Sequence, residues 1–97
     1  MWIGWLEFDI LLGDVHSLKE KRSVVRPVVA ELRRRFSVSA AEVGDTDLYR
    51  RAGIGMACVA GDRAHVVEVL DGAERLVAAR PEIELLSVRR GLSRSDD

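Results

Sequence analysis

The sequence predicts an α+β fold of the ferredoxin-like type, a βαββαβ sandwich with one four-stranded antiparallel sheet and both helices on one face. Segments with strand and helix periodicity follow one another in the order strand, helix, strand, strand, helix, strand. They form two βαβ units of about 40 residues, and a right-handed crossover in each unit places both helices on the same side. A chain of 97 residues with 47% hydrophobic content suits a single core. We therefore expect one domain at residues 1–90 and a flexible C-terminal tail at 91–97.

The first strand is predicted at residues 2–12, where the side chains alternate between two faces. The apolar face carries Trp2, Leu6, Phe8, Ile10 and Leu12. The other face carries Ile3, Trp5, Glu7, Asp9 and Leu11. Because only the apolar face can meet the helices, we expect the second face to be solvated, bound by a partner or paired with another copy.

The first helix is predicted to begin at Ser17 and to end at Phe36. Ser17 and Glu20 have the spacing of a capping box, and apolar residues then recur at helical spacing. Pro27 lacks an amide hydrogen and crowds the preceding turn. The sequence therefore predicts a kink or a separated first turn near Ser23.

The second half of the chain repeats this order. Residues 37–43 and 52–60 are two short β-prone segments separated by a turn. Asp62 caps a second amphipathic helix that Pro81 stops, and residues 82–90 are the fourth strand.

Charge and composition limit the kind of protein. The net charge is −1, yet residues 16–36 hold seven Lys or Arg and only two acids. Cys58 is the single cysteine, which excludes an internal disulfide. No run of about 18 uncharged apolar residues is present, so we expect no membrane span, no signal peptide and a cytoplasmic location.

The first helix has cations at both ends. At its start, HSLKEKRS adds positive charge where unpaired amides already favour an anion, which suits phosphate or a nucleic-acid backbone. A second cluster, Arg33 to Arg35, ends the helix. It lies about 20 Å from the first cluster along a regular helix, a distance that an RNA helix bridges. The alternative is that nearby acids neutralise the first cluster and that the second only stabilises the helix end. The candidate anion- or RNA-binding residues are Lys19, Lys21, Arg22, Arg26, Arg33 and Arg34.

The open sheet face offers a second candidate surface. Trp5 lies there by parity, and base-stacking RNA-binding domains use aromatic residues on such sheets, but residues 52–60 contain none. An interface with a second copy or another protein, formed by Ile3, Trp5 and Leu11, is favoured because large apolar surface is usually covered.

No catalytic, cofactor or metal site is expected. Glu7 and Asp9 share a face, but no nucleophile or base accompanies them. His16 and His65 lack a second ligand at metal spacing. A small-molecule or metal-binding enzyme would need a pocket with converging titratable groups, which the sequence does not indicate. We therefore expect a protein that is not an enzyme.

Three blocks of sequence resemble a known family. They are IGWLEFDILL, HSLKEKRSVVRPVVAELRRRFSVSAAEV and DLYRRAGIGMACVAGDRAHVVEVLD. They resemble the YlxP-like family of small bacterial proteins, a domain of unknown function, across most of the chain. The resemblance implies a ferredoxin-like fold, a bacterial cytoplasmic location, and genes that often lie beside those for translation initiation factor two and ribosome-binding factor A. It carries over no catalytic activity, and Pro27 departs from the helix former that is usual in the family.

These features together predict a non-enzymatic protein that binds ribosomal or structured RNA, or a ribosome-associated surface, through its basic first helix, and that forms a homodimer. The alternative is a protein-binding or homo-oligomerisation module that uses the open sheet face and binds no nucleic acid. In that case the basic helix is merely solvated.

Overall fold

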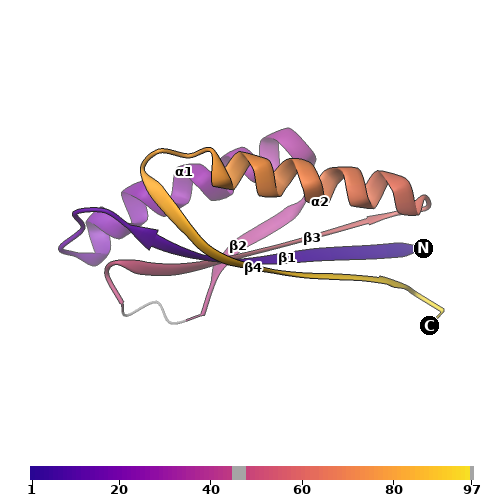
Figure 1. Cartoon of the computed structure of the whole chain (residues 1–97), viewed down its shortest axis with the longest axis horizontal. Helices are drawn as coiled ribbons and strands as arrows, with labels where there is room; N and C mark the ends of the chain where they lie inside the picture. Colours follow the sequence, from indigo (N-terminus) through magenta and orange to yellow (C-terminus); the bar gives the residue numbers. More distant parts are fainter. Residues whose placement is uncertain (45–47, 97) are drawn as a thin grey trace.

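The computed structural model describes residues 1–44 and 48–96. The elements are β1 (Trp2–Leu12), α1 (Leu18–Phe36), β2 (Ser39–Val43), β3 (Arg51–Ala60), α2 (Arg63–Ala78) and β4 (Ile83–Arg94). The four strands form one antiparallel sheet in the order β2-β3-β1-β4, and both helices cover the same face of it (Figure 1). The predicted ferredoxin-like fold is confirmed.

The core lies between the helices and one face of the sheet. In β1 the side chains of Leu6, Phe8, Ile10 and Leu12 are at most 1% exposed, and the intervening residues face the other way. Valines and leucines of α1 and α2 pack onto them. Each such side chain stabilises the fold by about 1.5–3 kcal/mol when it leaves water, so the alternation in β1 fixes which face the helices cover.

Helix α1 begins with a variant of the predicted capping box. The Ser17 Oγ accepts a hydrogen bond from the Glu20 amide at 3.1 Å, and the Glu20 carboxylate accepts one from the His16 amide at 3.2 Å. The helix then continues without interruption through Pro27, so the predicted separation of its first turn is wrong. The Ser23 hydroxyl donates to the Glu20 carbonyl at 2.6 Å, inside the turn that precedes the proline.

The C-terminal segment corrects a second expectation. Residues 91–94 belong to β4 and pair with the start of β1, with Leu92 opposite Gly4 and Arg94 opposite Trp2. The Ser95 amide also donates to the Met1 carbonyl at 2.9 Å. The predicted flexible tail therefore does not begin at 91. The mostly polar composition of residues 91–97 suggests a flexible tail, but the apolar Leu92 packs against the core and holds this segment in the sheet.

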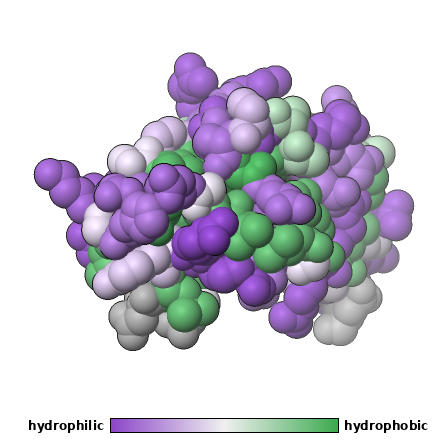
Figure 2. Space-filling view, turned by 60° about the vertical axis from the view of Figure 1, so that its left-hand side comes forward, coloured by the Kyte–Doolittle hydropathy of each residue, from purple (hydrophilic) through white to green (hydrophobic). Residues whose placement is uncertain are grey.

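The surface is mixed in character. Figure 2 shows one side of the molecule, on which hydrophilic residues surround exposed hydrophobic ones. Within the described residues, no helix has the length and apolar content needed to cross a membrane.

Gly4 permits the close approach of α2 to the sheet. A Cβ at this position would overlap Val66 Cγ1 and would lie 3.1 Å from Leu70 Cδ1, and both side chains are fully buried. Since packed cores resist added volume, Gly4→Ala is expected to lower the free energy of unfolding by about 1–3 kcal/mol in urea titrations.

Gly61→Ala is the matched control, because a Cβ there meets nothing within 4 Å. Its stability is expected to equal or slightly exceed that of the unmodified chain, through reduced entropy of the unfolded state. Equal stability of the two variants would contradict this account of the packing between β1 and α2.

Candidate functional site

Four cations of α1 lie along one line on its outer surface. Lys19, Arg22, Arg26 and Arg33 are separated by three, four and seven residues, spacings that bring side chains onto the same helix face. All four are exposed, and they extend over about 21 Å at 1.5 Å per residue. We call these four residues the basic stripe. Arg34 is also exposed and follows the last of them.

The acids near the start of α1 do not cancel the stripe. Asp14 pairs with His16 at 2.5 Å, Asp9 with Arg51 at 2.5 Å, and Glu7 lies 3.8 Å from Arg89. Glu20 is engaged by the His16 amide. Within residues 1–44 and 48–96, no carboxylate lies within 4.0 Å of a stripe residue or of Arg34. The expected alternative, neutralisation by neighbouring acids, is therefore not seen in the described part of the chain.

Lys21 is the exception among the predicted cations. It is 1% exposed, its Nζ donates to the Leu48 carbonyl at 2.6 Å, and it lies 3.3 Å from the Glu42 carboxylate. The expectation that Lys21 belongs to the outward cationic surface is wrong. Its spacing of four and seven residues from the buried Val25 and Val28 was the available signal, because that spacing puts it on the core side.

Arg33 joins the stripe to the edge of the sheet. Its Nε and Nη2 atoms donate to the Ala40 carbonyl of β2 at 2.9 and 2.5 Å. A guanidinium has five N–H donors, so hydrogen-bonding capacity remains. This contact turns the far end of the stripe toward β2.

A hollow of about 380 Å³ lies at the near end of the stripe. It is lined by Lys19, Arg22, Ser23, Arg26 and Pro27. Three cations thus border a concave surface along the first three turns of α1. Charged donors arranged in this way suit an anionic oxygen group such as a phosphate.

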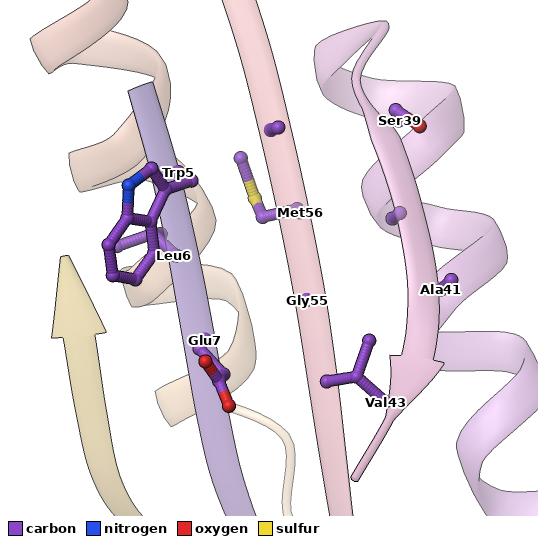
Figure 3. Close-up of a pocket in the computed structure, with 10 residues that line it drawn as sticks. Trp5, Leu6, Glu7, Ser39, Ala41, Val43, Gly55 and Met56 are labelled. Carbon is purple, nitrogen blue, oxygen red and sulfur yellow. The ribbon is translucent and has the colours of Figure 1, made fainter. Parts of the chain in front are cut away.

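The open sheet face contains a second concave surface. Trp5 is 38% exposed, and its indole lies against Gly91 of β4, where a Cβ would overlap the ring. Beside it is a hollow of about 340 Å³ that includes Glu7, Val43 and Gly55. Figure 3 shows Trp5 and Glu7 on β1 and Val43 on β2, to either side of Gly55 on β3. We call this feature the glycine-floored hollow.

The predicted partner-face residues share this open face. Ile3, Trp5 and Leu11 occupy alternate positions of β1, and Ile3 and Leu11 are half-buried. Sequence reasoning did not find the hollow beside them. Gly53 and Gly55 at outward positions of β3 were the signal, because glycine leaves a strand surface uncovered.

Other reactive groups do not assemble a site in the described residues. Burial raises the pKa of the Cys58 thiol and so favours its protonated form. A hydrogen bond with the Gly4 backbone acts in the opposite direction and is the smaller effect. Over residues 1–44 and 48–96, no three His, Cys, Asp or Glu side chains gather closely enough to hold a metal ion.

Comparison with known proteins identifies a family, a curated relative and a structural neighbour. A family model described as a protein of unknown function, DUF503, matches residues 3–90. The uncharacterized protein YlxP of Bacillus subtilis (strain 168) is 33% identical over 82 residues, which cover 84% of this chain and 89% of that protein. A crystal structure of a variant of SnoaB, a cofactor-independent oxygenase from Streptomyces nogalater, matches with a TM-score of 0.52 and 13% identity, covering 99% of this chain and 94% of that one.

The structural comparison corrects one expectation from the sequence. We expected a protein that is not an enzyme, but the fold is shared with an oxygenase that works without a cofactor. The fold is thus compatible with catalysis, and the expectation is overturned. At 13% identity the likeness concerns the fold alone.

The contrast between Lys21 and Lys19 is testable by stability. Lys21→Ala removes a buried ammonium from the Leu48 carbonyl and from Glu42, whose side chain is 24% exposed. The loss is expected to be about 2–3 kcal/mol, since unpaired buried groups are costly. Lys19→Ala, an exposed control, is expected to change stability by about 0.5 kcal/mol or less in the same urea titration. Similar losses in both variants would contradict the assignment of Lys21 to the interior.

Proposed function

We propose that this chain, which belongs to the DUF503 family of proteins of unknown function, binds polyanions, structured RNA above all, through the basic stripe of α1. Its relative YlxP is the protein after which the family that the sequence resembles is named. The observation that carries the proposal is the row of exposed cations without carboxylate partners in the described residues. A surface of this kind attracts phosphates because its charge is not already satisfied within the protein.

The composition of the stripe favours backbone contacts over base recognition. Between Lys19 and Arg33, the exposed side chains include no aromatic ring for a base to stack on. Phosphate contacts position a protein on a nucleic acid but carry no sequence information. We therefore expect recognition of RNA shape and charge, with little dependence on base sequence.

The number of contacts sets the expected strength. Three or four phosphate contacts give a salt slope of roughly −2 to −4, at about −0.7 to −0.9 per contact. Non-specific binding of this kind has dissociation constants on the order of 10⁻⁴–10⁻⁶ M at physiological salt. A second copy or a shaped RNA surface would strengthen it by multivalency.

Ribosomal RNA is the first candidate ligand within this class. The gene neighbourhood implied by the family resemblance, beside translation initiation and ribosome-binding factors, supports this choice. The proposal accordingly includes a cytoplasmic location and an association with the ribosome.

A charge-matched pair of triple variants tests the stripe. The purified chain is titrated against fragments of ribosomal RNA by filter binding at several salt concentrations. Changing Lys19, Arg22 and Arg26 to Ala is expected to weaken binding at least tenfold and to flatten the salt slope by about 2–3, since three phosphate contacts are lost. Circular dichroism checks that the fold is retained.

The control changes three exposed arginines that lie off the stripe and off the open sheet face, Arg50, Arg63 and Arg75, to Ala, with the same loss of charge. Its salt slope is expected to stay close to that of the unmodified chain. Equal losses of RNA affinity in both variants would show that binding depends on net charge alone, and would reject the stripe as a site. Duplex DNA run in parallel shows whether the binding is particular to RNA.

A further inference from the structure

The open sheet face carries a projection directly beside a hollow. Trp5 is paired in register with Ala57 of β3, and Glu7 is paired with Gly55. The indole turns toward β4 and covers Gly91, which leaves the surface above β3 uncovered. The outward positions of β3 there are Gly53, Gly55 and Ala57, whose side chains are too small to fill it.

We propose that this face pairs with the same face of a second copy, so that Trp5 of each copy sits in the glycine-floored hollow of the other. A two-fold interface must be self-complementary, because each contact from one copy to the other occurs twice. A projection and a hollow side by side on one face meet this requirement. Tryptophan is among the residue types that most often anchor an interface by filling a pocket, which suits Trp5 to this role.

Apolar exposure on this face supports the pairing. Val59 is 61% exposed and lies opposite Ile3 in the register, so it belongs to the same face as Trp5. These side chains flank the hollow on the side away from the charged residues. Contiguous apolar surface of this kind is typically covered by a partner.

The charges near the hollow are also compatible with a second copy. Glu7 and Asp9 of β1 lie among Arg51 of β3 and Arg89 of β4, around an adjoining hollow of about 370 Å³. Two acids and two arginines give this area no net charge. The Glu7–Arg89 contact is loose at 3.8 Å and both side chains are well exposed. A face with a single sign of charge would repel its own copy, whereas this one offers each carboxylate a second arginine.

The size of the face is adequate. Strands β1, β3 and β4 have 10–12 residues, or roughly 33–40 Å at about 3.3 Å per residue, and four strands at about 4.8 Å span roughly 19 Å. Because β2 has only 5 residues, the four strands together cover a projected area of roughly 600 Å², which is of the same order as the ~800 Å² per partner of a typical stable interface.

The pairing leaves the basic stripe accessible. Both helices lie on the opposite face of the sheet from Trp5, so pairing of the open faces turns each α1 outward (Figure 1). The two surfaces are independent, and self-association here does not depend on polyanion binding.

Sedimentation equilibrium from low to high micromolar protein tests the proposal. The unmodified chain is expected to approach twice the monomer mass. Trp5→Ala removes the projection, and Ala57→Arg places a long charged side chain in the hollow without disturbing a buried position. Each variant is expected to raise the dimer dissociation constant at least tenfold. Ala64→Asp, an exposed position in the first turn of α2, is the control that should leave it unchanged.

Circular dichroism of each variant separates loss of pairing from loss of fold, and Ala57→Arg remains informative if Trp5→Ala is unstable. A chain that stays monomeric throughout, as when the face binds a small molecule or another protein instead, overturns the proposal. A dimer that persists in both variants also overturns it, because another surface must then form the contact. The variant that lacks Lys19, Arg22 and Arg26 should still dimerise, which keeps this result separate from that of the RNA titration.

Discussion

One-sided burial of the central strand determines the organisation of this protein. β1 pairs with β3 on one side and with β4 on the other, and alternate side chains from Leu6 to Leu12 are buried under the helices. Because the side chains of a strand alternate strictly, the intervening residues must face away from the helices. The open face and the outward surface of α1 are therefore two consequences of the same constraint. The candidate sites lie on these two surfaces, on opposite sides of a single core.

Glycine gives the two faces of the sheet different shapes. On the covered face, Gly4 lets Val66 of α2 approach the strand more closely than any side chain would allow. On the open face, Gly55 leaves a hollow and Gly91 leaves room for the Trp5 ring beside β4. Gly53 has a further role, since a Cβ there would lie 2.6 Å from the Val43 carbonyl oxygen of β2. Close packing and concavity both follow from absent side chains.

The cations of α1 divide according to their position around the helix. Lys21 points to the core side, where the Leu48 carbonyl and the Glu42 carboxylate satisfy its ammonium, so its charge links α1 to these two residues. Lys19, Arg22 and Arg26 point outward, and no carboxylate of the described residues lies within 4.0 Å of their charged groups. Residues adjacent in sequence thus have different roles, because a step of about 100° per residue separates their directions. A count of the cations in α1 therefore includes one, Lys21, that does not contribute to the exposed cationic surface.

The sequence by itself determined the order of the elements, the parity of β1, the cap at Ser17 and the outward cations, because all of these follow from periodicity within a few residues. Only the tertiary structure decided the fate of Lys21, whose partners Leu48 and Glu42 lie 27 and 21 residues away. The same holds for residues 91–94, which are ordered as strand by pairing with β1, and for the hollow, which depends on the direction of the Trp5 indole. Local patterns set the direction of a side chain, but its partner is set by where the rest of the chain folds, and that is a property of the three-dimensional packing.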